Sequence, residues 1–218
     1  MYSTPMKVCT LLLVCSSAAR AFIACACRDP HLVLAYDGHA DMRGTPGKVY
    51  NFVSSSHTNV NVRVQDSLYK LRNATVNGTF VSEVHVLSGD ARISVFARRL
   101  NGNNYAWNFV DVKCGARPLH SLGPHGRTQC GGDANVELGY SSVLIHGSEW
   151  DLAVSGNFVY NRLAGEEHRL DVSFYPHKSG LVHHGLLGQS YDGTGVPRIG
   201  KQDVYPAKGN FTTSANLE

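Results

Sequence analysis

The stretch from Cys27 to Phe52, CRDPHLVLAYDGHADMRGTPGKVYNF, decides the fold of this chain. It opens with an Asp-Pro turn and continues through apolar residues from Leu32 to Tyr36. The pair Asp37-Gly38 then interrupts the apolar run, because Asp-Gly favours a tight turn. After a polar stretch rich in glycine, apolar residues return from Val49 to Val53. Two short apolar runs bounded by turn residues predict two β-strands.

Apolar and polar residues alternate through most of the chain after this stretch. Such alternation is typical of a sheet that has one face on a core and the other in water. Short strands separated by frequent turn residues predict an all-β fold, an antiparallel β-sandwich or barrel. One helix-like pattern spans Asn161 to Arg169. The alternating apolar positions include Val60, Val62, Val64, Val84, Val86, Leu152, Val154, Leu170, Val172 and Phe174, and the predicted turns include Asn77-Gly78 and Gly89-Asp90.

The N-terminus, Met1 to Ala21, has the pattern of a secretory signal peptide. Lys7 precedes an apolar run, and Ala19-Arg20-Ala21 is a small-x-small cleavage site. A second such site ends at Ala26. The pattern predicts a secreted, extracellular protein, and the apolar run is too short to span a membrane. The remaining 22–218 segment is too short for two comfortable domains, so we expect one.

The charge balance argues against a nucleic-acid partner. The formal net charge of +3 includes Lys7 and Arg20, and without these two the chain has 18 basic against 17 acidic residues. Nucleic-acid binding needs a basic face that displaces counterions. No stripe of lysine and arginine provides one.

The cysteine count depends on where the signal is cleaved. Cleavage after Ala21 leaves an even set, Cys25, Cys27, Cys114 and Cys130, whereas cleavage after Ala26 leaves three. An even set suits an oxidising compartment. Cys114 and Cys130 bracket a segment rich in glycine, proline and histidine, and a bridge there would clip a loop. The pairing of Cys25 and Cys27 stays open.

Three N-glycosylation sequons fit the same compartment. They begin at Asn73, Asn77 and Asn210. Because three-residue matches arise by chance, they gain their meaning from the signal peptide. The sequence therefore predicts a glycoprotein.

The chain resembles a von Willebrand factor type D domain at both ends. The D-P-H-L segment ending at Asp37-Gly38 matches the first hairpin of that family, and the segment from His183 to Gly193, HHGLLGQSYDG, resembles its C-G-L-C-G-N-[FY]-D-G signature. His184 and Leu187 stand where that signature has cysteines. The chain is similar to the cysteine-poor members, such as root-cap-type proteins and secreted proteins of algae and protists.

The resemblance implies several properties. The fold would be an antiparallel β-sandwich with its two ends side by side, and Val76-Asn77-Gly78 would form a hairpin turn. The family's calcium ion would have Asp37 as its first ligand and Asp192 in the second ligand segment, with Asp203 as the next carboxylate. Calcium prefers six to eight oxygen ligands, however, and Thr194-Gly195-Val196-Pro197 replaces the Asn-Asn-Asp cluster expected there.

Two functional hypotheses follow. The first is a non-enzymatic binding or assembly module that presents loops to an extracellular protein or a cell-wall glycan. The alternative is a secreted hydrolase that uses an Asp/His cluster of Asp29, His31, Asp37 and His184.

The aromatic residues leave a related question open. They are Tyr105, Trp107 and Phe109, which alternate, with Tyr140 and Trp150 as candidate neighbours. Such a row can stack on sugar rings or fill a core, and a β-sandwich core favours burial.

Overall fold

The computed structural model describes residues 23–27, 31–97, 109–119, 122–177, 184–191, 194–197, 199–201 and 206–211. The predicted signal peptide and the predicted site residues Asp29, Asp192 and Asp203 lie outside these ranges.

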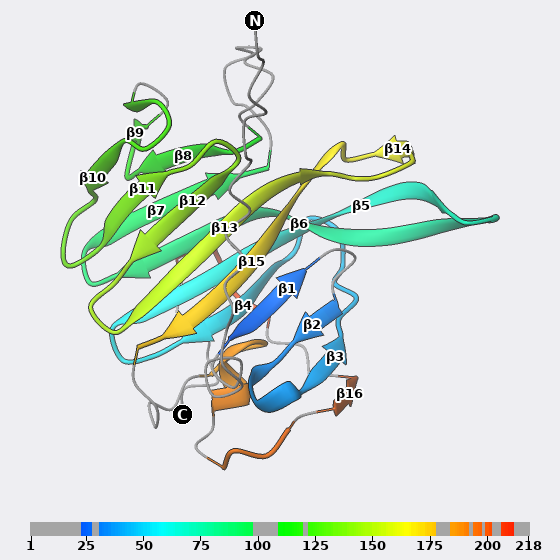
Figure 1. The fold of residues 1–218 in the computed structure, drawn as a ribbon, viewed down its shortest axis with the longest axis horizontal. Coiled ribbons are helices and arrows are strands. Elements are labelled where there is room, and N and C mark those ends of the chain that lie inside the picture. Colours follow the sequence, from blue (N-terminus) through cyan, green and yellow to red (C-terminus); the bar gives the residue numbers. More distant parts are fainter. Residues whose placement is uncertain are drawn as a thin grey trace, which may run out of the picture.

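The described residues form strands joined by turns, with two short 3-10 helices (Figure 1). The N-terminal half contains β1 (Ala24–Cys27), β2 (His31–Val33), η1 (Ala35–Asp37), β3 (His39–Asp41), β4 (Val49–Ser54), β5 (Thr58–Leu71), β6 (Ala74–Ser88) and β7 (Ala91–Phe96). The C-terminal half contains β8 (Asp111–Cys114), β9 (Arg117–Pro118), β10 (Arg127–Gln129), β11 (Asn135–Leu138), β12 (Ser142–His146), β13 (Trp150–Phe158), β14 (Arg162–Gly165), β15 (His168–Pro176), η3 (Gly188–Tyr191) and β16 (Ile199–Lys201).

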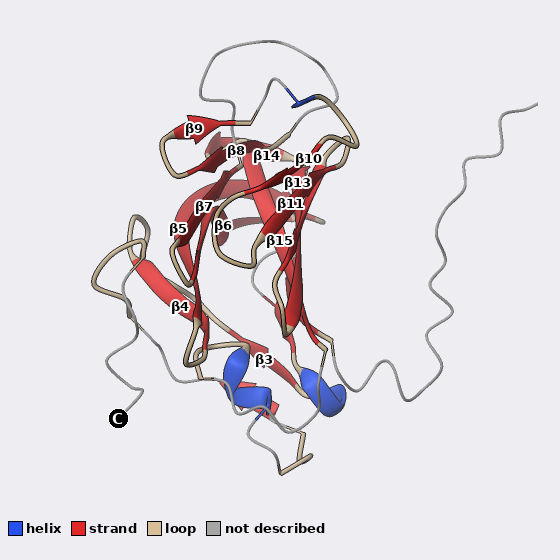
Figure 2. Cartoon of the chain, turned by 90° about the vertical axis from the view of Figure 1, so that its left-hand side faces the viewer, coloured by secondary structure: helices blue, strands red, loops and turns tan. Residues whose placement is uncertain are grey.

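The strands belong to one curled sheet with two arms. The first arm has the order β10-β11-β12-β13-β15-β1-β2-β3-β16, and the second contains β4 to β9 with β14. The arms join where Leu170 of β15 pairs with Val81 of β6. Neighbouring strands are antiparallel, with the exception of β16 and β3. Figure 2 shows the two arms facing each other. The predicted all-β, antiparallel fold is confirmed.

The core lies between the arms and contains the alternating apolar residues. Val60, Val62 and Val64 of β5 are fully buried, as the two-residue period requires when one face points inward. Burying each such side chain stabilises the fold by roughly 1.5–3 kcal/mol. Trp150 of β13 lies in the same core and donates its Nε1–H to Thr58 Oγ1 of β5 at 2.9 Å. This hydrogen bond ties one arm to the other.

The helix predicted at Asn161 to Arg169 is wrong. The segment contains β14 and the start of β15, and β14 pairs with β5. Asn161 has φ 53° and Gly165 has φ 84°, and both values are left-handed and incompatible with a right-handed helix. Pairing with a neighbouring strand outweighs the local pattern here.

The turn predicted at Asn77-Gly78 is also wrong. β6 runs through both residues, and the hairpin turn lies at Arg72-Asn73. The register continues on both sides of Asn77, because Leu68 pairs with Asn77 and Ser67 with Gly78. Continuous pairing with β5 keeps this Asn-Gly pair extended.

The polar face of β5 is buried in part, where the alternation predicts contact with water. Asn59 and Asn61 are 4% and 0% exposed. Asn61 accepts a hydrogen bond from Asn51 Nδ2 at 2.8 Å and donates to the Asn210 carbonyl at 3.1 Å. The segment Pro206–Phe211 therefore covers this face, and the buried amides have the hydrogen bonds that burial requires.

Candidate functional site

The two end motifs lie side by side. η1 contacts η3, and the N–H groups of Leu186 and Leu187 donate to the carbonyls of Asn51 and Phe52 at 3.0 and 2.8 Å. Tyr191 is buried, and this burial raises the pKa of its hydroxyl. Backbone hydrogen bonds therefore join β4 to the C-terminal Gly-rich segment, and η1, at the end of the first motif, lies against the same segment.

Of the three predicted calcium ligands, only Asp37 lies in the described ranges. Asp37 is exposed at φ 61° at the end of η1. Among the described residues, no three or more His, Cys, Asp or Glu side chains are grouped so that they could hold a metal ion. Asp192 and Asp203 lie outside the described ranges. The described donor set does not by itself fit calcium, and calcium binding stays a prediction.

The predicted hydrolase residues are not joined. The His31 imidazole forms a 2.6 Å pair with Asp41, at an exposed position. Within the described part of the chain, no hydrogen bond or ion pair connects Asp37 with His184. His184 instead bonds through its backbone to Ser54 of β4.

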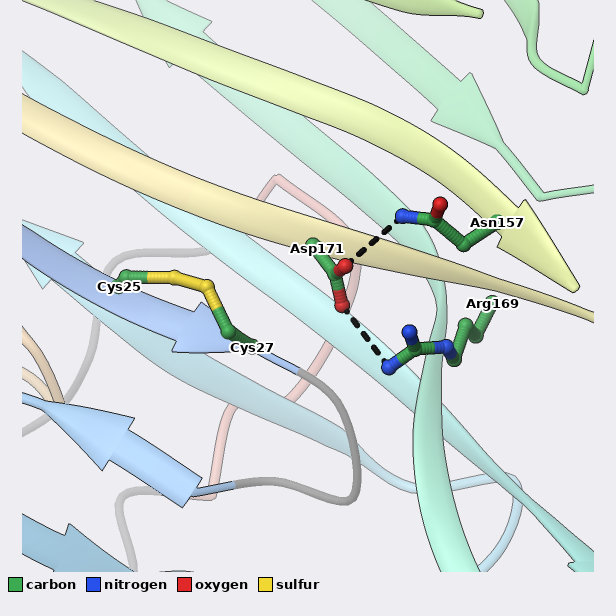
Figure 3. The surroundings of a disulfide bond; sticks show 5 residues. All are labelled: Cys25, Cys27, Asn157, Arg169 and Asp171. Atoms are coloured by element: carbon green, nitrogen blue, oxygen red, sulfur yellow. Dashed lines mark hydrogen bonds and ion pairs between the residues drawn. A yellow bond between two sulfur atoms is a disulfide. The ribbon is translucent and has the colours of Figure 1, made fainter. Parts of the chain in front are cut away.

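Both pairs of cysteines form disulfides. Cys114 and Cys130 are bonded with a Cα–Cα distance of 5.3 Å. Cys25 and Cys27, whose pairing the sequence left open, are bonded to each other within β1. Figure 3 shows this second bridge beside Asp171 of β15.

The three sequons differ in their surroundings. Asn73 and Asn77 are exposed on the β5–β6 hairpin. Asn210 is half-buried, and its Oδ1 accepts a hydrogen bond from Arg63 Nη2 at 3.0 Å. The hairpin sequons are therefore the more accessible ones, and glycosylation stays a prediction at all three.

The aromatic row does not form one surface. Trp150 is 2% exposed and stacks on Phe174, with ring centroids 6.3 Å apart. Tyr140 is exposed and lies against His125, and Phe109 packs on Phe158. Tyr105 and Trp107 lie outside the described residues. Burial of Trp150 in the core agrees with the preferred prediction.

A charged network lies under the C-terminal segment. The Glu83 carboxylate accepts hydrogen bonds from His85 Nε2 at 3.0 Å and Arg63 Nε at 3.1 Å. The bond from His85 lowers the pKa of Glu83, although burial opposes this shift, and Arg63 adds to the lowering. The Phe211 ring packs edge-on against His85 with centroids 5.5 Å apart. This network anchors the C-terminal segment to the sheet.

A pocket that the sequence did not reveal lies on the β5–β6 hairpin, which extends beyond the rest of the sheet (Figure 1). Its volume is about 430 Å³, within the range of roughly 300–1,000 Å³ that is typical of small-molecule sites. Its lining combines aromatic, aliphatic and basic side chains, namely His31, Tyr69, Lys70, Leu71, Phe80, Val159, Tyr160 and Arg169.

The floor of this pocket is a small hydrophobic cluster separate from the main core. Tyr69, Phe80 and Val159 are its buried members, and Val76 packs against them. The rings of Tyr69 and Phe80 meet edge to face, with centroids 5.7 Å apart. This geometry is favourable for aromatic pairs, so the floor is well packed.

The side of the pocket is positioned by a turn. The backbone N–H of Lys70 donates to the Asn161 carbonyl at 3.0 Å, and Asn161 Nδ2 donates to the Lys70 carbonyl at 3.5 Å. These bonds hold the preceding residue, Tyr160, next to β5. Tyr160 is 82% exposed, so its ring is available to a ligand.

Arg169 is held at the pocket by fixed partners. Its Nη1 donates to Asp171 Oδ1 at 3.1 Å, and its Nε donates to the Phe158 carbonyl at 3.3 Å. Asn157 Nδ2 donates to the other oxygen of Asp171 at 2.8 Å, as Figure 3 shows. The guanidinium is therefore oriented before any ligand arrives.

Sequence reasoning missed this pocket because its residues come from four separate strands and a turn. No spacing in the sequence links Tyr69 with Tyr160. One feature of the sequence could have indicated the pocket. The stretches 68–79 and 158–165 contain basic residues together with aromatic or aliphatic ones, and neither contains Asp or Glu.

No protein-family model matches the chain, and no curated protein matches it at a significant level. No helix in the described ranges is long and apolar enough to cross a membrane.

Proposed function

We propose that this protein is a secreted, non-enzymatic binding or assembly module of the extracellular space. Its architecture would be an antiparallel β-sandwich that resembles a von Willebrand type D domain of the cysteine-poor variety. The N-terminal signal pattern and the sequons support secretion. The two disulfides fit the same oxidising compartment.

The observation that carries this proposal is the open pocket on the protruding hairpin. A rigid sheet with a well-packed floor presents an exposed aromatic ring, Tyr160, and two cations, Lys70 and Arg169. Aromatic and arginine side chains are the residues that dominate binding energy at interfaces. Among the described residues the pocket lining contains no carboxylate, and Asp41, which pairs with His31, is not one of the lining residues. Recognition explains this set of side chains better than bond cleavage does.

The partner would be an extracellular protein or a cell-wall glycan. Strand β5 is already paired with β6 on one side and with β14 on the other at Ser67 to Tyr69. A partner at this place therefore contacts side chains and does not add a strand to β5.

The test begins with full-length chain expressed in a secreting host. Intact mass of the protein recovered from the medium, with and without reductant, reports the cleavage site, the disulfides and the glycans together. The protein is then applied to an array of extracellular-matrix proteins and cell-wall polysaccharides, beside a Tyr160→Ala variant. We expect at least one ligand whose signal falls in the variant. Retention of Met1 in protein found inside the cell, or an array without any ligand that depends on Tyr160, would overturn the proposal.

A further inference from the structure

We propose that the hairpin pocket binds an acidic sugar, that is, a pyranose ring carrying a carboxylate or a sulfate group. This inference rests on the proposed binding function and names the ligand class of the same site.

The charges around the pocket favour an anionic ligand. Its lining includes His31, Lys70 and Arg169, and none of the described lining residues is acidic. Asp41 pairs with the His31 imidazole and Asp171 with the Arg169 guanidinium, whereas no described acidic side chain forms an ion pair with Lys70. An anionic group on the ligand would provide Lys70 with an ion-pair partner, through a charge-assisted hydrogen bond.

Basic side chains lie on both segments beside the pocket. Lys70 and Arg72 belong to the β5–β6 hairpin and Arg162 to β14. The stretches 68–79 and 158–165 contain no Asp or Glu, although Glu166 and Glu167 follow the second stretch directly. A local excess of basic side chains raises the local concentration of anions. The whole chain is close to neutral, so this positive region is local and does not reflect general basicity.

The aromatic side chains favour a ring with an apolar face. The exposed Tyr160 ring stands beside a floor made of Tyr69 and Phe80. An aromatic face packs against the C–H groups of a flat ring, while a tyrosine hydroxyl remains available for hydrogen bonds to hydroxyl groups. A sugar ring with one acidic group matches this combination of flat apolar wall and cationic rim.

The shape of the pocket favours a sugar over a membrane surface as the ligand. The hairpin also exposes Leu71 (56%) and the neighbouring β14 exposes Leu163 (49%), and basic residues beside apolar ones could contact an anionic bilayer. However, the aromatic floor lies inside a concave pocket of about 430 Å³, where a discrete ring fits and a flat bilayer does not. The exposed sequon Asn73 at the hairpin turn would also place a glycan between this tip and a membrane.

Calorimetric titration of the full-length protein tests the inference. The probes are trigalacturonate, its methyl ester, which has the same rings without the charge, and a sulfated galactose trisaccharide. We expect at least one acidic probe to bind at least about tenfold more tightly than the ester, as expected for the loss of a hydrogen bond to a charged group. The two acidic arms identify carboxylate or sulfate as the recognised group.

Matched variants show whether the pocket is responsible. Lys70→Gln and Tyr160→Ala should each weaken binding about tenfold, and both residues are exposed, so folding should not suffer. Arg72→Gln removes a cation from the same hairpin outside the pocket and should change the affinity less than about twofold. Tyr140→Ala removes an exposed tyrosine elsewhere and serves as the aromatic control.

Several results would overturn the inference. These are equal binding of acid and ester, equal effects of the Lys70 and Arg72 variants, and binding confined to phosphatidylserine vesicles. A neutral glycan or an extracellular protein that binds in a Tyr160-dependent way, with no response to acidic sugars, would overturn the acidic-sugar inference and leave the binding function standing. Absence of every Tyr160-dependent ligand would overturn both.

Discussion

The hydrogen bond between Trp150 and Thr58 allows a direct test of how the two arms of the sheet pack. Trp150→Phe removes the buried indole N–H and leaves a cavity, and we expect it to lower the free energy of unfolding by roughly 2–4 kcal/mol. Thr58→Val leaves the same N–H without its 2.9 Å acceptor and should cost roughly 1–3 kcal/mol. The double variant loses both partners, so its cost should fall short of the sum by about 1 kcal/mol. Urea unfolding at pH 7 measures the free energy of unfolding of the wild type, the two single variants and the double variant. The four values can be compared if the slope of that free energy against urea concentration is the same in all of them.

Thr79→Val is the matched control for this cycle. Thr79 is buried like Thr58, but its Oγ1 has no hydrogen-bond partner among the described residues. Replacing this hydroxyl by a methyl group should leave stability unchanged or raise it. The comparison uses protein made without glycans, because Thr79 belongs to a sequon. A coupling energy below about 0.3 kcal/mol between Trp150 and Thr58, or a loss in Thr79→Val as large as in Thr58→Val, would refute the packing of the arms described above.

Three further predictions concern the C-terminal Gly-rich segment, the loop closed by the Cys114–Cys130 disulfide, and the dependence of stability on acid pH. Gly185→Ala should destabilise the protein by roughly 3 kcal/mol or more, measured by urea unfolding, because Gly185 has φ 95° and a Cβ would lie 2.7 Å from the Phe52 backbone. Replacing Cys114 and Cys130 by serine should cost roughly 3 kcal/mol, and an unchanged melting temperature would contradict this bridge. Because the folded state lowers the pKa of Glu83 below its ordinary value of 4.5, its contribution is complete above that pH and is lost as the pH falls through the folded pKa. The stability difference between the wild type and Glu83→Gln should therefore shrink below about pH 4.5, whereas a difference that grows on acidification would contradict the assignment.

The period of two in the apolar residues was enough to predict the fold class and much of the core. Val60, Val62 and Val64 are buried as the alternation requires, because in a strand every second side chain points to the same face. The period does not state which strands pair. The alternation therefore predicted an all-β chain but not the order of the strands in the curled sheet.

The failures of sequence reasoning share one physical cause. The Asn161–Arg169 segment has a local preference for helix and the Asn77-Gly78 pair has one for a turn. Both are extended by strand pairing, because β5 pairs with Arg162–Gly165 and with Asn77-Gly78, and β13 pairs with His168 and Arg169. Asn61 was expected to face water and is buried because Pro206–Phe211 covers it. Contacts between residues far apart in the sequence outweighed local preference in every case.

The amino-acid sequence by itself determined the strand-forming character and the buried valines, and it contains the signal-peptide pattern from which secretion is predicted, because these features depend on residue type and short spacing. Only the tertiary structure decided that Cys25 bonds to Cys27 and that Tyr69, Phe80 and Tyr160 enclose a pocket beside Lys70 and Arg169. A pocket depends on which distant strands the sheet brings together, and that choice is made by packing over the whole core rather than by any single stretch.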